Sequence, residues 1–384
     1  MASLNAKKNI MLSRTPPMGW NSWNTFGSNI NEDLIKSTAD NMVSKGFLEA
    51  GYNYLVIDDC WSEMKRDENG RLLASKEKFP NGMKAVADYV HSKGLKFGMY
   101  SCCGTRTCAG YPGSFEYEYI DAETFASWGI DFLKYDYCLR PNFSEGKHLY
   151  RKMAMALRST GRDILFSACN WGADNVYDWI RSSGAHMFRS TGDIVDNWDS
   201  IKSLYRSQME KGPYGAPGCF NDMDMLIVGM YGKGNVGFGG CSDEEYRTHF
   251  ALWCMFNSPL MIGCDINNIS DTARELLINK DLISINQDTE GRQPYLANDF
   301  CGDRHTWVKP MANGEYAIGY FNLSDNRTDV LLNFWDIGVP SLSGYGVELY
   351  DCFKHETIGV FRDFYNPMVE AHGCAVFKAR VVKL

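Results

Sequence analysis

Carboxylates and other polar side chains recur in this sequence directly after short apolar segments. Asp58 and Asp59 follow residues 54–57, and Asp136 follows residues 130–135. The full set at such segment ends is Trp23, Asp58, Asp59, Tyr100, Lys134, Asp136, Asn170, Trp171, Arg189, Asp193, Asp222 and Asp224. Carboxylates, lysine and arginine form charge-assisted hydrogen bonds to hydroxyl groups, and indole rings pack on apolar faces. The pattern predicts a site for a polyhydroxylated ligand, with two aspartates available as nucleophile and acid for glycoside cleavage.

The simplest alternative is that these aspartates only cap the helices that follow them, since aspartate is common at helix N-caps. That explanation does not cover Lys134, which lies within a predicted buried strand two residues before Asp136. A lysine there costs desolvation free energy unless it is paired. We expect a pair with Asp136, because such a pair would keep Asp136 ionised, as a nucleophile must be.

One unit, a helix followed by glycine and then an apolar strand, recurs between residues 16 and 290. Gly46, Gly94, Gly129 and Gly161 end four predicted helices, since glycine adopts the left-handed cap conformation at little cost. Apolar runs after such caps are typical of buried parallel strands. The expected strands are residues 18–22, 54–57, 95–100, 130–135, 164–168, 186–189, 218–221 and 259–263.

Eight strands in about 275 residues predict a (β/α)8 barrel over residues 1–291. A doubly wound sheet is the rival, but it would collect its ligand groups at one switch point. Here polar groups follow nearly every strand, which favours the barrel. Active sites of such barrels form where the strands end.

The pattern changes beyond residue 292, where short strands alternate with turns rich in Asn, Asp and Gly. These strands are residues 305–308, 316–321, 330–334, 347–350, 357–360 and 374–378. They predict an antiparallel β-sandwich of the Greek-key kind over residues 292–384. No low-complexity linker separates the two parts, so we expect them to pack against each other.

Composition excludes several classes of function. The chain has 384 residues, with 39 basic and 47 acidic side chains and a net charge of −8, so nucleic acid is not an expected partner. No apolar run approaches the roughly 20 residues that a membrane helix needs. Lys7 and Lys8 are not followed by an apolar segment, so we expect no signal peptide and a cytoplasmic location, or secretion if a leader has been removed.

The 13 cysteines are odd in number, scattered and without a CxxC pair, which favours mostly reduced, buried thiols. With only 7 histidines and no closely spaced ligand pairs, we expect no zinc site. Residues 232–237 match the GxGxxG pattern of dinucleotide-binding proteins, but no helix opens there. The next helix is predicted to begin at Ser242, with Glu245 completing a capping box.

Seven segments together resemble glycoside hydrolase family 27, the α-galactosidase or melibiase family. They are residues 17–23 (PMGWNSW), 57–61 (IDDCW), 107–114 (TCAGYPGS), 133–138 (LKYDYC), 169–172 (CNWG), 189–198 (RSTGDIVDNW) and 221–226 (NDMDML). The resemblance covers the whole barrel in the order of the family. It implies a (β/α)8 barrel followed by a β-sandwich, and hydrolysis of terminal α-linked D-galactose from oligosaccharides or glycans without a cofactor or metal.

The resemblance also implies roles for individual residues. Asp136 is the expected nucleophile and Asp193 the acid/base, so the pKa of Asp193 should lie above that of Asp136. Cys108 and Cys138 match a disulfide beside the site. The residues expected to bind the sugar are Asp58 and Asp59 (O6 and O4), Lys134 (O3 and O4), Arg189 (O2 and O3), Trp23 (the floor), and Tyr100, Asn170, Trp171 and Asp224.

Several alternatives stay open at this point. A β-L-arabinopyranosidase would not need Asp58 at O6, and an α-N-acetylgalactosaminidase needs small residues beside C2, where Cys169 and Trp171 are bulky but Ala173 is small. A glycan-binding relative without activity would be expected to lack Asp136 or Asp193. The sequence is compatible with several natural α-galactosides as substrates and with association between copies of the chain.

Overall fold

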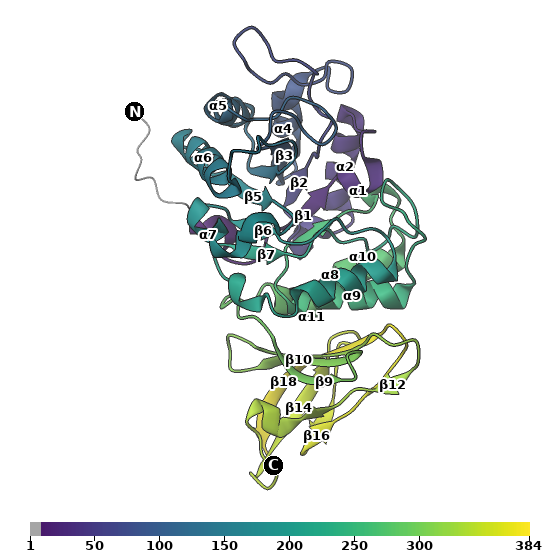
Figure 1. The fold of residues 1–384 in the computed structure, drawn as a ribbon. Helices are drawn as coiled ribbons and strands as arrows, with labels where there is room; N and C mark the ends of the chain where they lie inside the picture. The colour runs from purple at the N-terminus through teal and green to yellow at the C-terminus, as the bar shows by residue number, and fades with distance from the viewer. Residues whose placement is uncertain (1–8) are drawn as a thin grey trace.

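A closed barrel of parallel strands forms the first part of the computed structural model, which describes residues 9–384 (Figure 1). Its eight-stranded sheet has the order β7-β6-β5-β4-β3-β2-β1-β8. The strands are β1 (Met18–Asn21), β2 (Tyr54–Val56), β3 (Lys96–Cys102), β4 (Phe132–Asp136), β5 (Leu165–Cys169), β6 (Met187–Arg189), β7 (Phe220–Asp222) and β8 (Leu260–Ile262). The ring closes through Leu226, just after β7, whose amide donates to Met261 O at 2.8 Å. The predicted barrel is thereby confirmed.

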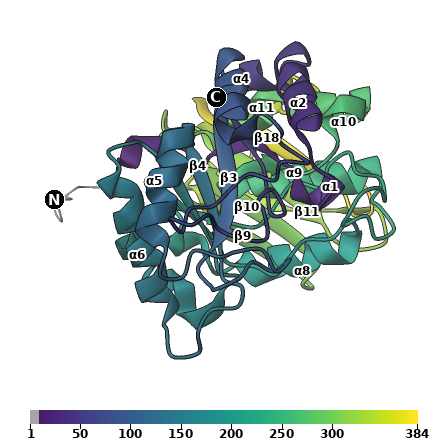
Figure 2. The ribbon, with the colours of Figure 1, turned by 90° about the horizontal axis from the view of Figure 1, so that it is seen from above.

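Helices surround the strands, as Figure 2 shows for α2, α4, α5 and α6. The longer helices are α2 (Glu32–Ser44), α4 (Gly82–Ser92), α5 (Glu118–Trp128), α6 (Gly146–Ser159), α8 (Trp198–Gln208), α9 (Asp243–Met255), α10 (Asp271–Leu277) and α11 (Lys280–Asn286), and the short ones are α1 (Trp23–Phe26), α3 (Phe47–Ala50) and α7 (Ile180–Ser183). Gly46, Gly94, Gly129 and Gly161 have the positive φ angles that the cap prediction required. The carboxyl ends of the strands that follow these helices therefore lie on the same face of the barrel.

A second, antiparallel part follows α11. Its six-stranded sheet has the order β15-β14-β18-β11-β10-β9, and two short pairs, β12 with β17 and β13 with β16, lie beside it. The bounds are β9 (Tyr295–Phe300), β10 (Arg304–Pro310), β11 (Tyr316–Asn322), β12 (Thr328–Asp329), β13 (Leu332–Asn333), β14 (Tyr345–Asp351), β15 (Glu356–Phe361), β16 (Phe364–Tyr365), β17 (Met368–Val369) and β18 (Cys374–Lys383). The last strand, β18, pairs between the hairpins β10–β11 and β14–β15, which confirms the predicted antiparallel sandwich.

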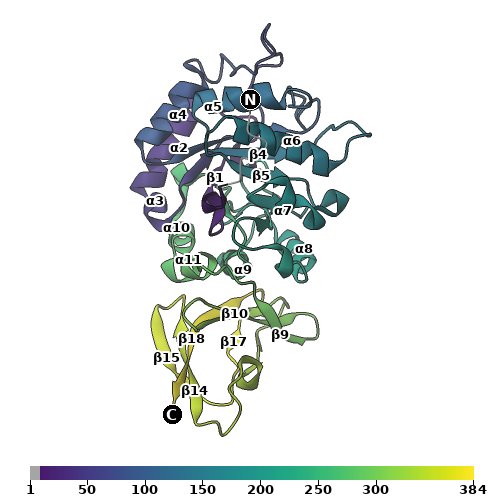
Figure 3. The ribbon, with the colours of Figure 1, turned by 90° about the vertical axis from the view of Figure 1, so that its left-hand side faces the viewer.

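The two parts pack against each other along α8, α9 and α11 (Figure 3). Tyr205 of α8 lies at the centre of the polar contacts between the two parts. Its hydroxyl lies 2.6 Å from His305 Nδ1 and accepts a hydrogen bond from Trp307 Nε1 at 2.7 Å. All three side chains are buried. The expected direct packing of barrel and sandwich is confirmed, and the sandwich lies on the side of the barrel that these helices cover.

A buried lysine in this contact makes unfolding depend on pH. Lys309 is fully buried, and its Nζ donates to the neutral acceptors Asn257 Oδ1 and Ile285 O. Burial lowers the pKa of Lys309 to about 7, against the weaker opposing charge of Asp288. Since the unfolded chain holds a proton on this lysine up to higher pH, the lysine lowers stability fully at and below pH 7, and stability should rise with pH above 7.

We therefore expect the unfolding free energy of the parent protein, relative to Lys309→Met, to rise by up to about 1.4 kcal/mol per pH unit between pH 7 and 9. Urea unfolding of both proteins at pH 7, 8 and 9 measures this difference, and other titrating groups cancel in the comparison. A difference that does not vary with pH would mean that Lys309 stays charged in the folded protein.

No helix among residues 9–384 is long and apolar enough to cross a membrane. Lys7 and Lys8, on which the expectation about a signal peptide depends, lie outside the described residues.

Candidate active site

A cavity opens at the carboxyl ends of the barrel strands and encloses about 580 Å³ together with its mouth. It collects every residue predicted to contact the substrate except Asn170. The lining consists of Trp23, Asn24, Asp58, Asp59, Tyr100, Cys108, Lys134, Asp136, Trp171, Arg189, Asp193, Ile194, Asp224, Met225 and Val236. These residues lie in or after β1 to β7, so the cavity is surrounded on all sides by the barrel mouth. Asn24, Ile194, Met225 and Val236 were not predicted as lining residues.

Lys134 pairs with Asp58, which corrects the predicted pair with Asp136. Its Nζ lies 2.7 Å from Asp58 Oδ2, an oxygen that also accepts from Asn21 Nδ2 at 2.7 Å. The long lysine side chain reaches from β4 toward Asp58, two residues after the end of β2, rather than toward Asp136 in its own strand. Lys134 still acts on Asp136 at longer range, since its positive charge lowers the pKa of that carboxyl.

Asp136 is a buried carboxylate with a fixed orientation. Its Oδ2 accepts from the Tyr100 hydroxyl at 2.9 Å, and its Oδ1 accepts from the Tyr137 amide at 2.8 Å. Burial raises the pKa of Asp136 above its ordinary value, although the charges of Lys134 and Arg189 and these hydrogen bonds oppose the shift. Asp136 therefore lines the cavity with both carboxylate oxygens held by hydrogen bonds, as a positioned nucleophile requires.

Asp193 lies on the loop after β6 and is far more exposed than Asp136. Its side chain is 74% exposed and forms an ion pair with Arg189, which is buried. Partial burial raises the pKa of Asp193, but the charge and hydrogen bond of Arg189 outweigh it, so the net pKa lies below the ordinary value. The expectation that the pKa of Asp193 exceeds that of Asp136 is therefore wrong for the unliganded protein, because the arginine neighbour was not anticipated.

Asp224 holds the Asp193 loop in place. Its Oδ1 lies 3.2 Å from Arg189 Nη1, and its Oδ2 accepts from the amide of Ile194 at 2.7 Å. Asp222, the neighbour two residues earlier, does not line the cavity, and its Oδ1 accepts the amide of Asp224 at 2.9 Å. Burial, then the charge of Asp224, raises the pKa of Asp222 to about 7. The two aspartates therefore differ: Asp224 lines the cavity, whereas Asp222 lies outside the lining and holds the backbone of Asp224.

Asn170 is buried but does not line the cavity. Its Nδ2 donates to Ala173 O at 2.9 Å, which ties the amide to the following turn instead of to a ligand. The adjacent Trp171 does line the cavity, has a positive φ of 60°, and meets the Tyr137 ring edge-on. The backbone after β5 therefore turns the indole, and not the asparagine amide, toward the substrate.

Cys108 and Cys138 form a disulfide at the cavity wall, as the resemblance implied. Their Cα atoms lie 5.4 Å apart, within the ordinary range for a disulfide. Of the other cysteines, Cys301 is exposed and the rest are buried, which agrees with the expectation of mostly buried thiols.

The glycine-rich segment that resembles a dinucleotide motif has a structural role here. It runs alongside α1, where the Val236 amide donates to Asn24 O at 3.0 Å. A Cβ on Gly234 would lie 2.7 Å from Thr25 Cα, so only glycine allows this approach. The next helix, α9, begins after Ser242 with the predicted capping box to Glu245. The segment thus brings Val236 to the cavity and does not open a helix for a phosphate.

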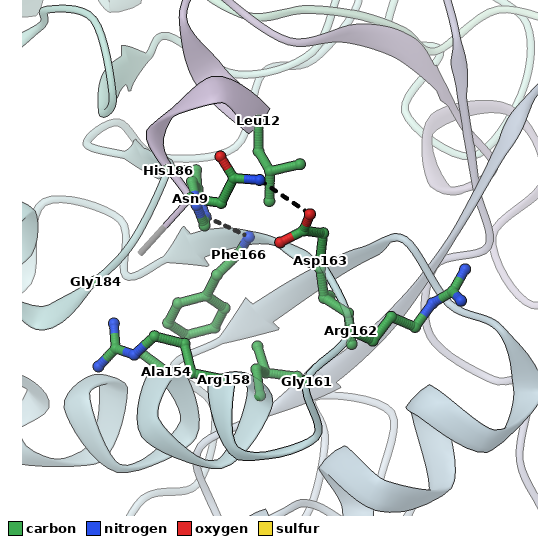
Figure 4. Close-up of a pocket in the computed structure, with 12 residues that line it drawn as sticks. Asn9, Leu12, Ala154, Arg158, Gly161, Arg162, Asp163, Phe166, Gly184 and His186 are labelled. Carbon is green, nitrogen blue, oxygen red and sulfur yellow. Dashed lines mark hydrogen bonds between the residues drawn. The ribbon is translucent and has the colours of Figure 1, made fainter. Parts of the chain in front are cut away.

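A second cavity lies at the opposite, amino ends of β5 and β6 (Figure 4). There Asn9 Nδ2 donates to Asp163 Oδ2 at 2.9 Å, and the Phe166 amide donates to His186 Nδ1 at 2.9 Å. The first bond joins the start of the described chain to the residues before β5, and the second joins β5 to the residue before β6. Catalytic groups of such barrels lie at the carboxyl ends, so this cavity is not the candidate active site.

Comparison with known proteins agrees with this geometry. Residues 15–288 match the family described as alpha galactosidase A, and residues 301–379 match the alpha galactosidase C-terminal beta sandwich domain. The chain therefore belongs to the α-galactosidase (melibiase) family, glycoside hydrolase family 27. An α-galactosidase of Cyamopsis tetragonoloba is 42% identical over 367 residues, which cover 95% of this chain and 86% of that protein.

Two solved structures show the same fold along their full length. α-Galactosidase I from Mortierella vinacea is 34% identical with a TM-score of 0.88, and the match covers 97% of this chain and 98% of that one. An α-galactosidase from Saccharomyces cerevisiae, solved with raffinose, is 29% identical with a TM-score of 0.89, over 98% of this chain and 100% of that one. Family membership makes this protein a glycoside hydrolase of the α-galactosidase class.

Proposed function

We propose that this protein is a retaining exo-α-galactosidase that removes terminal α-linked D-galactose by double displacement. The observation that carries this proposal is the presence of two carboxylates, Asp136 and Asp193, in one cavity ringed by hydrogen-bonding side chains. Because residues after seven strands surround the cavity, it fits one terminal sugar better than the middle of a chain. The raffinose-bound relative makes raffinose-type oligosaccharides the first natural substrates to examine.

In the first step, an Asp136 oxygen attacks the anomeric carbon while Asp193 gives its proton to the glycosidic oxygen. The bond to the aglycone breaks, the aglycone leaves with that proton, and galactose is held as an ester of Asp136. In the second step, Asp193 takes a proton from water, the oxygen of that water attacks the anomeric carbon, and Asp136 leaves as a carboxylate. Two inversions give overall retention.

Recognition of galactose rests on the groups beside the two carboxylates. Asp58, held by Lys134 and Asn21, keeps a fixed negative oxygen in the cavity, which suits a hydrogen bond to O6. L-Arabinopyranose is galactose without the C6 hydroxymethyl group, so it could not form this hydrogen bond to Asp58. A site built to hydrogen-bond a hydroxyl rejects analogues that lack it, and this favours galactose.

Substrate binding has to change the state of Asp193. In the free protein Asp193 has a lowered pKa and Asp136 a raised one, so the required pair, protonated Asp193 with ionised Asp136, is the minor form. We propose that sugar hydroxyls take hydrogen bonds from Arg189, which keeps its second partner Asp224. Arg189 then divides its hydrogen bonds between Asp193 and the sugar, so it stabilises the Asp193 carboxylate less. The sugar also excludes water from the cavity, and both changes raise the pKa of Asp193 in the complex.

This account predicts that the two pH–rate profiles differ. The first step needs protonated Asp193, and with a substrate whose leaving group is poor this step limits the rate, so the rate is lost as pH rises through the pKa of Asp193. The profile of kcat/KM reports the free enzyme and that of kcat reports the complex. We therefore expect the alkaline limb of kcat to lie at least about one pH unit above that of kcat/KM. Steady-state rates with a raffinose-type substrate across pH 3–8 measure both limbs, and coincident limbs would contradict the proposed exchange at Arg189.

The function is tested by rates on three nitrophenyl glycosides and by the stereochemistry of the product. We expect kcat/KM for the α-D-galactoside to exceed those for the β-L-arabinopyranoside and the α-N-acetylgalactosaminide by about 10²-fold or more. NMR spectra taken during hydrolysis should show α-galactose first. Preference for either other sugar, or release of β-galactose first, would refute the proposal.

A further inference from the structure

The disulfide lies against the carboxylate that the proposed mechanism uses as nucleophile. The sulfur atoms of Cys108 and Cys138 and a carboxylate oxygen of Asp136 all lie within 4.8 Å of one another. Cys138 Sγ also lies 3.8 Å from the Tyr100 hydroxyl, the group that donates to Asp136 Oδ2. Two sulfurs and an oxygen thus converge at one side of the cavity, and Cys108 itself forms part of the lining.

We propose that reduction of this disulfide creates a binding site for a thiophilic divalent cation, such as Zn²⁺ or Cd²⁺, made of Cys108, Cys138 and Asp136, and that the bound cation stops catalysis. While the disulfide is intact, neither sulfur is available as a thiolate ligand. Two small-molecule thiols can reduce it: they leave joined as a disulfide, and each cysteine sulfur receives one hydrogen. The cation then displaces both thiol protons into solvent and bonds to two thiolates and one carboxylate oxygen.

The ligand set and its spacing suit such a cation. Thiolate and carboxylate are both ligands of tetrahedral zinc, and Zn–S bonds of about 2.3 Å hold two sulfurs roughly 3.8 Å apart. The three ligand atoms already lie within 4.8 Å of one another, so separation of the reduced sulfurs needs only side-chain rotation. Cys108 lies outside the helices and strands, in the loop between β3 and α5. Three protein ligands leave the fourth position for water.

Other thiols near the cavity are poorer ligands. Burial raises the pKa of the Cys102 thiol to about 12, and burial also raises the pKa of Cys103 and Cys169. Buried thiols of this kind stay protonated and unreactive. Cys301 is exposed but lies in the sandwich, at the turn after β9. Cation binding at the cavity is therefore expected to depend on the Cys108–Cys138 pair.

Loss of activity follows if Asp136 is the nucleophile, so this half of the inference depends on the proposed function. A divalent cation bonded to this carboxylate withdraws electron density from it, which makes it a much poorer nucleophile, and the cation also occupies part of the cavity where the sugar would bind. The binding half depends only on the three side chains and can be measured without turnover.

Cd²⁺ titration of the intact protein tests both the binding and the inhibition. Binding is followed by the ultraviolet absorbance of Cd–thiolate bonds, and inhibition is followed by the rate of hydrolysis. The disulfide is reduced with a water-soluble phosphine, which takes the oxygen of water and leaves its two hydrogens on the sulfurs. We expect one equivalent of Cd²⁺ to bind the reduced protein with this absorbance and to lower its rate at least about tenfold. A chelator should restore the rate, and the oxidised protein should show neither effect.

Two variants separate the contributions of the two thiols and of Asp136 to cation binding. The double variant Cys108→Ser/Cys138→Ser, treated in the same way, should lose this absorbance and keep its own cation-free rate when Cd²⁺ is added. Asp136→Asn keeps both thiols, so it should still show the absorbance but bind Cd²⁺ at least about tenfold more weakly.

Equal Cd²⁺ absorbance in the reduced parent and the double variant would overturn the site and leave the proposed function untouched. Tight binding that Asp136→Asn weakens, without any loss of rate in the parent, would overturn the inhibition and count against Asp136 as the nucleophile.

Discussion

Asp136→Ala should hydrolyse an aryl α-galactoside at least about 10⁴-fold more slowly than the parent protein, because no other group can form the galactosyl ester. The variant should fold, since burial disfavours the charged carboxylate, and the hydroxyl of its partner Tyr100 borders the cavity, where water can replace the lost acceptor. Rates with a nitrophenyl galactoside and a thermal unfolding curve measure the two expectations.

Added azide separates a lost nucleophile from a damaged site. With Asp136→Ala, azide can enter the space of the missing carboxylate and attack the anomeric carbon directly. One displacement then gives β-galactosyl azide, with the configuration inverted. The isosteric Asp136→Asn variant is the matched control, since its amide fills that space and should not be rescued. A rate within tenfold of the parent for either variant would remove Asp136 from the mechanism.

Asp193→Ala should lose about 10²–10⁴-fold in kcat/KM on raffinose-type substrates, whose leaving group needs a proton. The loss should be far smaller for a dinitrophenyl galactoside, whose leaving group departs without one. Because the Asp193 side chain is 74% exposed, its removal leaves no void in the core. Rates on the two substrate types, compared for the parent and the variant, give the difference directly.

Azide also reports on Asp193. It can attack the galactosyl ester of Asp136 without a general base, so Asp193→Ala should give α-galactosyl azide with configuration retained. Asp199→Ala is a suitable control, since this carboxylate is exposed on α8 and forms an ion pair with Lys202. An equal loss for good and poor leaving groups would show that Asp193 does not act as the acid.

The barrel and the position of its site could be predicted because both follow from local patterns. Apolar runs after glycine caps identify the strands, and parallel strands in a closed ring bring their carboxyl ends together. Their place at strand ends was enough to predict that Asp58, Asp136 and Arg189 belong to the site. The short pairs β12–β17 and β13–β16 were harder, because strands of two residues carry no periodicity.

The pairing of side chains could not be predicted in the same way. Lys134 is two residues from Asp136 in sequence, yet its long side chain meets Asp58. Arg189 reaches the Asp193 loop, and this contact reverses the expected order of the two carboxyl pKa values. Such contacts depend on side-chain rotamers and on the paths of loops, which hydrophobic patterns do not specify.

Loops explain the remaining differences. Val236 reaches the cavity because glycines let its segment run against α1, and the backbone after β5 turns Trp171 inward while Asn170 bonds to Ala173. A positive φ at Trp171 is unusual for a tryptophan, so no residue preference would have indicated this turn. The strand ends were predictable, and the loops that complete the cavity required the structure.

Trapping the galactosyl ester tests the central claim most directly. A fluorinated galactosyl donor with a good leaving group forms the ester and slows its hydrolysis, so that the labelled protein can be digested and its peptides sequenced by mass spectrometry. The account predicts one added sugar per chain, on Asp136 in the segment 133–138 (LKYDYC). A label on Asp193 or another carboxylate, or turnover with no ester formed, would contradict it.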